Sequence, residues 1–94
     1  MSSLKGKKTH RSLLKKGFKE ERDRKDIFYY YYYNGKRTQI FTKMSHNPGD
    51  LSSWHIMKMA DQTKLSKNKF TGVADCTVSK EELLNYYLEE KIVY

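Results

Sequence analysis

Cysteine and proline are nearly absent from this sequence, and it has no long hydrophobic run. Its one cysteine, Cys76, has no partner for an internal disulfide, so nothing indicates an oxidising compartment. The longest apolar run, 27–33, is mostly tyrosine and falls far short of the ~20 residues that a membrane-spanning helix needs. The N-terminal segment lacks the apolar stretch of a signal peptide. We therefore expect a soluble, cytoplasmic protein without a membrane partner.

The chain has 94 residues, which is the size of one domain with a small core. Neither an internal repeat nor a Gly/Ser-rich linker divides it. We therefore interpret 1–94 as a single domain in which 66–94 form a helical C-terminal extension. A core this small leaves little room for a large cofactor, and we expect none.

Positive charge dominates and is unevenly distributed. The formal net charge is +8, with a pI near 9.6. Residues 1–25 carry a net charge of +7 and residues 26–73 carry +4, whereas residues 74–94 carry −3. This balance favours a polyanionic partner, although a basic pI also describes many proteins that bind no polyanion. A polyanion is expected to meet the N-terminal two thirds of the chain, with the acidic segment facing away or competing for the basic surface.

The strongest local pattern is a β-hairpin over 27–43. Aromatic and β-branched residues favour strands, and Asn34-Gly35 supplies the two positive φ angles of a type I′ turn. Closing the hairpin there predicts a core face with the pairs Tyr33 and Lys36, Tyr31 and Thr38, Tyr29 and Ile40, and Ile27 and Thr42. The opposite face is expected to be more exposed, although both are rich in aromatics; it carries Phe28, Tyr30, Tyr32, Arg37, Gln39 and Phe41.

The segment before the hairpin predicts a short helix and a charged strand. Residues 9–16 have a helical pattern around Leu13 and Leu14, and Gly17 can end the helix in the left-handed conformation. Residues 18–22 then form a third strand, whose charged side chains would keep a sheet edge from aggregating.

The segment after the hairpin predicts helices. Asn47-Pro48-Gly49 is typical of a turn, and Asp50 is expected to cap the helix that follows. The apolar residues of this helix cover a wide face, which predicts burial against the sheet; they are Leu51, Trp54, Ile56, Met57, Met59 and Ala60.

Two further helices are predicted by their N-terminal signals. Leu65 and Phe70 flank Ser66 as a hydrophobic staple, so a short helix begins near Lys67. The last helix runs from Lys80 to about Glu90, behind a capping box formed by Ser79 and Glu82. The elements together predict an α+β fold with a three-stranded antiparallel sheet in the order α-β-β-β-α and additional C-terminal helices.

Parts of this pattern resemble the HicA-like family of mRNA interferase toxins, which have a small fold like the double-stranded RNA-binding domain. The resemblance covers roughly residues 8–65 and rests on Leu-Leu-Lys-Lys-Gly-Phe at 13–18, the hairpin turn at Gly35 and a strand that ends at Ser45-His46 before a helix. HicA-like relatives of unknown activity also resemble this chain in 42–46 and 70–76. The resemblance implies an RNA-facing surface and, as a partner, an antitoxin-like protein.

One departure from the family bears on catalysis. The toxins carry their catalytic histidine in a Gly-Ser-His segment at the start of the second strand, where this chain has Asp23-Arg24-Lys25-Asp26. The resemblance therefore implies the fold and the RNA surface, while the toxins' catalytic histidine is missing. We expect feeble or absent ribonuclease activity.

Of the three histidines, His46 is the candidate for catalysis. It lies where a strand ends before a turn, and general base or phosphate contact are its two candidate roles. His10 is interpreted as part of the basic N-terminal patch and His55 as a structural residue of a packed helix. Cys76 is interpreted as a small buried residue, and no Cys/His spacing predicts a metal site.

The leading functional interpretation is an RNA-binding protein. Tyr30 and Tyr32 are expected to stack unpaired bases, with core or dimer packing as the alternative role of the tyrosine run. The predicted phosphate contacts are Lys5, Lys7, Lys8, Arg11, Lys15, Arg24, Lys25, Lys36 and Arg37. Two alternatives remain open, a metal-independent endoribonuclease that uses His46 and an interaction module that forms a homodimer or receives a protein partner.

Overall fold

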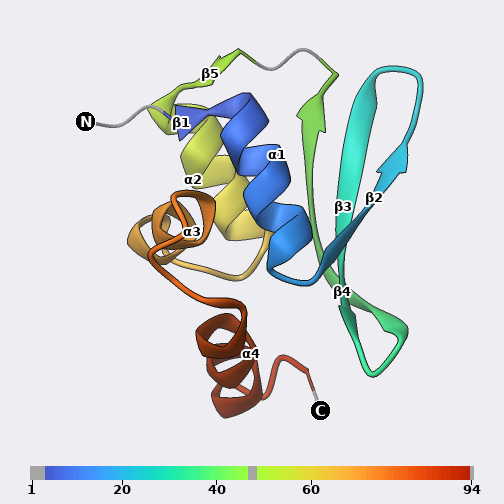
Figure 1. Cartoon of the computed structure of the whole chain (residues 1–94), viewed down its shortest axis with the longest axis vertical. Coiled ribbons are helices and arrows are strands. Elements are labelled where there is room, and N and C mark those ends of the chain that lie inside the picture. Colours follow the sequence, from blue (N-terminus) through green and yellow to red (C-terminus); the bar gives the residue numbers. More distant parts are fainter. Residues whose placement is uncertain (1–3, 47–48, 94) are drawn as a thin grey trace.

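The protein has an α+β architecture built on a three-stranded antiparallel sheet, as the sequence predicts (Figure 1). The computed structural model describes residues 4–46 and 49–93. The sheet has the order β2-β3-β4, with β2 at Phe18–Arg22, β3 at Asp26–Tyr33 and β4 at Lys36–Ser45. The helices of the described chain are α1 (Gly6–Lys15), α2 (Ser53–Gln62), α3 (Lys67–Ala74) and α4 (Lys80–Glu89).

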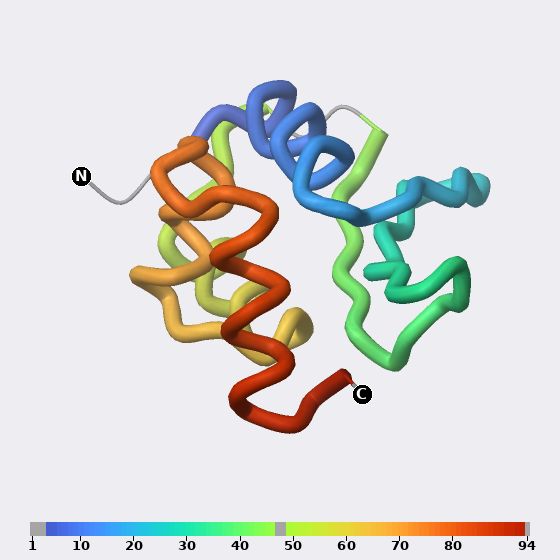
Figure 2. The backbone as a smooth tube through the Cα atoms, turned by 60° about the horizontal axis from the view of Figure 1, so that its bottom comes forward, coloured from blue at the N-terminus to red at the C-terminus, as the bar shows by residue number. Residues whose placement is uncertain are grey.

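The helices gather on one side of the sheet, and the other side is covered by no described element (Figures 1 and 2). Residues of alternate positions on β3 and β4 face the helices and are buried there; they are Ile27, Tyr29, Tyr31, Ile40, Thr42 and Met44. The ring of Tyr87 on α4 packs edge-on against Tyr31, with their centroids 4.9 Å apart. The core therefore lies between this inner sheet face and the helices.

The hairpin turn forms as predicted, but the register beyond it does not. Asn34 and Gly35 have φ angles of 53° and 76°, and Tyr33 pairs with Lys36. Between Tyr32 and Tyr30 the register then shifts by two residues. The predicted pairs of Tyr29 with Ile40 and of Ile27 with Thr42 are therefore wrong; Tyr29 pairs with Thr42 and Ile27 pairs with Met44.

The side chain of Thr38 holds this irregularity in place. Its hydroxyl donates to the carbonyl of Tyr31 at 2.7 Å and accepts from the amide of Ile40 at 3.2 Å. The predicted pairing of Tyr31 with Thr38 is thus replaced by a side-chain hydrogen bond. Because side chains alternate with a period of two, a shift of two residues leaves the predicted core face pointing inward.

The ends of several elements follow their local sequence signals. Strand β2 has the predicted bounds, and Gly17 before it has a φ of +108°. Ser66 caps α3, and Ser79 and Glu82 form the predicted capping box of α4. Helix α1 begins at Gly6 rather than at Thr9, because the amide of Gly6 donates to the carbonyl of Gly49 at 2.7 Å and fixes the chain there.

The segment around α2 corrects three predictions. Asp50 does not cap the helix: Asp50–Leu51 forms the short strand β5, paired with β1 (Leu4–Lys5), and Ser52 is the cap. Trp54 and Met57 are not buried, with 66% and 58% of their surfaces exposed. The neighbours of α2 cover only the narrower stripe of Ile56, Met59 and Ala60.

Two further observations complete the fold. The predicted turn at 47–49 lies mostly outside the described residues, since 47 and 48 are not among them. Within residues 4–46 and 49–93, every helix is too short or too polar to cross a membrane.

Candidate functional site

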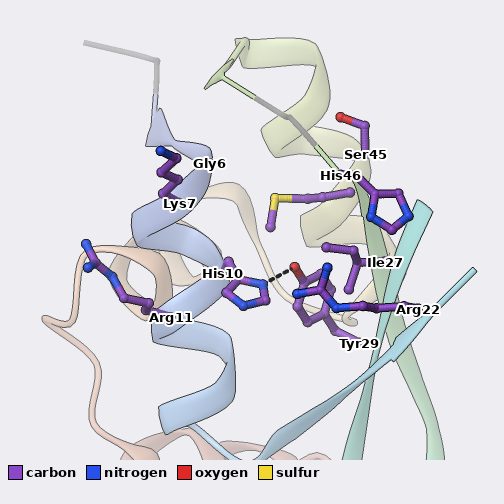
Figure 3. A pocket seen from close by; sticks show the side chains of 10 residues that line it. Gly6, Lys7, His10, Arg11, Arg22, Ile27, Tyr29, Ser45 and His46 are labelled. Atoms are coloured by element: carbon purple, nitrogen blue, oxygen red, sulfur yellow. Dashed lines mark hydrogen bonds between the residues drawn. The ribbon is translucent and has the colours of Figure 1, made fainter. Parts of the chain in front are cut away.

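A cavity of about 300 Å³ opens between the N-terminal half of α1 and the end of the sheet where the β2–β3 turn lies (Figure 3). Helix α1 contributes residues spaced three and four apart on one face, and β2 and β3 contribute inward-facing positions. The residues that line the cavity are Gly6, Lys7, His10, Arg11, Arg22, Ile27, Tyr29, Met44, Ser45 and His46. We call this cavity the His10–His46 pocket, after the two histidines that face it from different elements.

His10 is held by Tyr29 at the floor of the pocket. The imidazole Nδ1 lies 2.6 Å from the tyrosine hydroxyl, and the two rings meet edge to face at 5.5 Å. Burial raises the pKa of Tyr29 to about 12, with the charge of Glu20 adding to the rise and that of Arg22 opposing it. The hydroxyl therefore keeps its proton at neutral pH.

A protonated hydroxyl suits both states of His10. It donates to Nδ1 when the imidazole is neutral, which leaves the ring proton on Nε2. It accepts from Nδ1–H when the imidazole is charged. Tyr29 can therefore orient His10 without fixing its charge.

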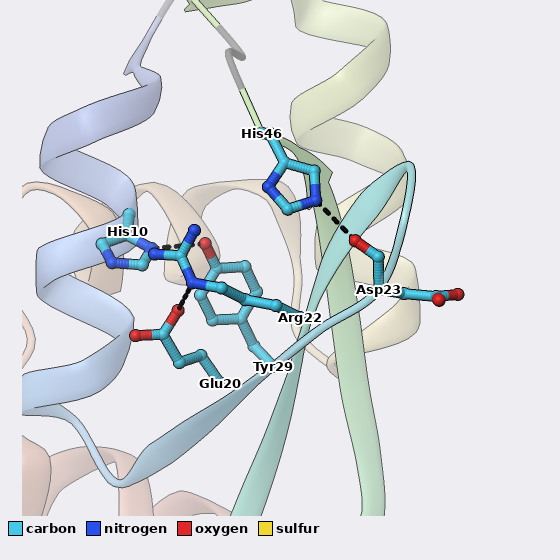
Figure 4. A network of polar contacts seen from close by, with 6 residues as sticks. All are labelled: His10, Glu20, Arg22, Asp23, Tyr29 and His46. Atoms are coloured by element: carbon cyan, nitrogen blue, oxygen red, sulfur yellow. Dashed lines mark hydrogen bonds and ion pairs between the residues drawn. The ribbon is translucent and has the colours of Figure 1, made fainter.

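His46 has a partner of a different kind. Its Nε2 lies 2.6 Å from the backbone carbonyl oxygen of Asp23, in the β2–β3 turn (Figure 4). A carbonyl only accepts, so Nε2 must carry the proton in this hydrogen bond. A neutral His46 then has its lone pair on Nδ1, which Figure 4 shows on the side of the ring toward Arg22.

Three cationic side chains line the pocket. Arg22 reaches in from β2 toward the imidazoles, whereas Lys7 and Arg11 lie on α1 and the Arg11 guanidinium points away from the imidazoles in Figure 3. Among residues 4–46 and 49–93, the one carboxylate paired with these groups is Glu20, whose Oε2 lies 3.2 Å from Nε of Arg22. The first turn of α1 has no acidic residue and its N-cap residue, Lys5, makes no side-chain cap bond. Because helix N-termini also favour anions, the pocket is suited to a negatively charged group.

The structure separates the predicted site residues into groups. Lys7, Arg11 and His46 line the pocket, and Arg24 and Lys25 are exposed on the adjacent β2–β3 turn. The remaining predicted residues lie outside the pocket: Lys5 pairs with Asp50, Lys8 and Lys15 are exposed on α1, Lys36 and Arg37 lie near the β3–β4 turn, and Tyr30 and Tyr32 face away from the helices.

His10, Tyr29 and Arg22 are among the pocket residues that were not predicted as site residues. On a helix, His10 and Arg11 lie three and four residues after Lys7 and therefore on the same face, so this spacing indicated that His10 accompanies the two cations. For Tyr29 no such signal exists, because it lies on the predicted core face of the hairpin, where packing is the ordinary role. Arg22 was predicted only as part of a charged edge strand, which does not indicate a site.

The predicted burial of Cys76 is wrong. The thiol is exposed, and its Sγ lies 3.2 Å from the hydroxyl oxygen of Ser12. That hydrogen bond, with the nearby positive charges of Lys16 and Lys15, lowers the pKa of the Cys76 thiol. His55 is also exposed and interacts with its own cap residue, Ser52, at 2.8 Å.

Metal ligation receives no support from the described ranges 4–46 and 49–93. There, no three His, Cys, Asp or Glu side chains are placed to hold a metal ion. Comparison of the chain with protein-family models, curated proteins and solved structures finds no match. The chemistry of the pocket is therefore the basis for assigning a function.

Proposed function

We propose that this protein binds RNA and holds a backbone phosphate in the His10–His46 pocket. The observation that carries the proposal is that Lys7, Arg11 and Arg22 line one cavity together with two imidazoles, at the N-terminus of a helix. Charged N–H donors of this kind make short, strong hydrogen bonds to phosphate oxygens. A cavity of about 300 Å³ also suits a phosphate with part of its sugar better than a large cofactor.

Two features support RNA as the polyanion. The net charge of +8 favours a nucleic acid over a neutral ligand. The resemblance of residues 13–18 and 42–46 to the HicA-like family favours RNA over DNA. The exposed Arg24 and Lys25 on the β2–β3 turn extend the positive surface beyond the pocket, where neighbouring phosphates would lie.

The test compares two substitutions that remove the same charge. Arg22→Gln alters the pocket, whereas Lys64→Gln alters an exposed lysine outside it. Affinity for a fluorescent RNA oligonucleotide is measured by anisotropy over a series of salt concentrations. We expect Arg22→Gln to weaken binding about tenfold and to reduce the slope of log K against log salt by about 1, with little change for Lys64→Gln. Equal effects of both substitutions, or no binding at low salt, would contradict the proposal.

A second candidate function, ribonuclease activity, is favoured by the different hydrogen-bond partners of the two histidines. His46 donates through Nε2 to a carbonyl and so presents a basic Nδ1. His10 is oriented through Nδ1 by Tyr29 and so presents Nε2–H. One pocket thus offers a proton acceptor and a proton donor, which is what cleavage of RNA through its ribose 2′-hydroxyl requires.

The reaction follows from these roles. Nδ1 of His46 takes the proton of the 2′-hydroxyl, whose oxygen attacks phosphorus and forms the new P–O bond. The bond from phosphorus to the 5′-oxygen breaks, and charged His10, whose Nδ1–H donates to the Tyr29 hydroxyl, protonates that leaving oxygen from Nε2 and becomes neutral. Arg22 and Lys7 stabilise the negative charge that develops on the phosphorane. The products are a 2′,3′-cyclic phosphate and a 5′-hydroxyl.

Cleavage of labelled RNA in EDTA distinguishes binding from catalysis. If the pocket is catalytic, His46→Ala and His10→Ala abolish cleavage while RNA affinity stays within a few-fold, because proton transfer acts on the transition state. His55→Ala, at an exposed histidine outside the pocket, is the matched control and should keep full activity. If the wild-type protein binds RNA but does not cleave it, only the binding function is supported. Cleavage that persists in both pocket variants would refute the roles assigned to His10 and His46.

A further inference from the structure

The face of the sheet that points away from the helices carries an ordered aromatic surface. We call it the outer sheet face and define it by Phe28, Tyr30, Tyr32 and Phe41, with the cations Lys19, Arg37 and Lys43. Its four aromatic side chains are only partly buried, and Figures 1 and 2 show no helix over this side of the sheet. Large apolar rings without a covering element indicate a binding surface.

The rings lie in contact along and across the strands. Phe28 and Tyr30 are nearly parallel, with an angle of 10° between their planes and 6.2 Å between their centroids. Tyr30 and Phe41 are 6.3 Å apart across the β3–β4 ladder. Such a row presents successive aromatic faces at the two-residue spacing of a strand, about 7 Å. Unpaired bases can stack on a row of this kind, since every base has an aromatic face.

Each of three rings also holds a cation. Arg37 lies 4.6 Å from the centroid of Tyr30, Lys19 lies 4.6 Å from that of Tyr32, and Lys43 lies 5.9 Å from that of Phe28. Two carboxylates offset part of this charge: Glu21 is 3.5 Å from Arg37, and Asp26 is 3.9 Å from Lys43. The face keeps one positive charge in excess, next to the rings that bases would contact.

That charge favours an RNA strand over a second copy of this chain. A two-fold symmetric dimer formed through this face would bring two copies of the same net-positive surface together. Like charges that face each other at an interface oppose its formation. The phosphates of a bound strand would instead meet a face whose net charge is opposite to their own.

The outer sheet face and the His10–His46 pocket meet at the same end of the sheet. Phe28 faces outward and its neighbours Ile27 and Tyr29 face the pocket, so adjacent residues of β3 belong to the two surfaces. The exposed Arg24 and Lys25 lie on the turn that links the two sides. We propose that the protein takes unpaired RNA, with bases stacked on the outer sheet face and the backbone continuing round the β2–β3 turn into the pocket.

This inference rests on the proposed function and narrows its substrate to single-stranded RNA. In a duplex the faces of the bases are already stacked on one another and cannot reach the protein's rings. A strand that turns round a sheet edge must also be flexible. The protein should therefore bind a single strand in preference to the duplex of the same sequence.

The test pairs two tyrosines that each have a cation over the ring. Tyr30→Leu removes the central ring of the outer sheet face, and Tyr86→Leu removes a ring on α4 that has Lys69 at 4.6 Å from its centroid. Affinities are measured for a single strand, its duplex and an abasic strand of the same length. We expect the single strand to bind more tightly than both others, and Tyr30→Leu to weaken its binding about 5- to 100-fold, with less than a twofold effect of Tyr86→Leu.

The outcomes separate this inference from the function on which it rests. If binding depends on Arg22 and on salt but is the same for single strand, duplex and abasic strand, the proposed function stands and the inference is overturned. If no RNA binds, both are overturned. If Tyr30→Leu dissociates a dimer in sedimentation and leaves RNA affinity unchanged, the face is a protein interface and the inference is again overturned.

Discussion

The two faces of strand β3 differ although both are built largely from tyrosine. On the inner face Tyr29 and Tyr31 are buried, with 0% and 2% of their surfaces exposed. On the outer face Tyr30 and Tyr32 are only partly buried and have cations over their rings. Consecutive residues of one type thus occupy two environments, and the alternation of the strand decides which environment each receives.

The chemical roles differ as much as the burial. The Tyr29 hydroxyl interacts with an imidazole in a pocket, and the Tyr31 ring packs between Phe18 and Tyr87. The Tyr30 ring instead has a guanidinium group over it and faces solvent. A run of one residue type in a sequence therefore does not indicate one repeated function.

The largest expected effect is a loss of stability from the inner face alone. Tyr29→Ala removes a fully buried ring and should lower the free energy of unfolding by about 3–5 kcal/mol. Tyr30→Ala makes the same chemical change on the outer face and should cost about 1 kcal/mol or less. Denaturant titration of both variants measures the difference. Similar losses would show that the outer face is as tightly packed as the inner one.

The hairpin turn sets where the alternation begins, and Gly35 is its most sensitive position. Its φ of +76° is unfavourable for a β-branched residue, so Gly35→Val should destabilise the protein by about 1–2 kcal/mol. A Cβ at this position has no atom within 4 Å, so the cost is conformational and not steric. Gly35→Asn, which tolerates this conformation, should therefore cost much less. Equal losses in the two variants would mean that backbone conformation is not the cause.

The register shift at Thr38 tests what keeps the inner and outer faces of the sheet distinct beyond the turn. Thr38→Val keeps the shape of the side chain but removes both hydrogen bonds of its hydroxyl, and we expect a loss of about 1 kcal/mol. Amide exchange at Ile40 should also become faster. Thr71→Val, which removes a hydroxyl bonded only to a carbonyl of its own helix, is the control and should change stability by about 0.5 kcal/mol or less. An unchanged Ile40 exchange rate would contradict the role of Thr38.

The last expected effect appears only at alkaline pH. The pKa of Tyr29 is raised from 10.0 to about 12 by burial, so between these values the unfolded chain loses a proton that the folded chain retains. Stability should therefore fall as the pH rises from 10 to 12. Tyr29→Phe has no hydroxyl to titrate at this position, so its stability should fall less steeply with pH. Part of the fall should remain, because Tyr31 and Tyr87 also have raised pKa values. Parallel curves for wild type and Tyr29→Phe would contradict the assignment.

The sequence was sufficient to predict those features of the structure that depend on a few neighbouring residues. The turn at Asn34-Gly35, the capping box of Ser79 and Glu82 and the bounds of β2 each depend on a few adjacent residues. The inner and outer faces of β3 were also predictable, because alternation needs no knowledge of the partner strand.

Tertiary contacts decided the features that the sequence did not reveal. The register depends on one threonine hydroxyl between two strands, and the exposure of Trp54 depends on how much of α2 its neighbours cover. His46 was predicted as a site residue from its place at a strand end. Its meeting with His10 and Arg22 follows only when α1 and the β2–β3 turn are packed together.

The two-residue shift at Thr38 has a consequence for insertions and deletions in this hairpin. Loss of both Thr38 and Gln39 would restore an uninterrupted ladder with the same side chains facing the helices. Loss of only one would turn Ile40, Thr42 and Met44 outward unless the backbone abandoned its alternation. Length variation at this point of the chain is therefore compatible with an intact core and an intact pocket when it comes in even steps.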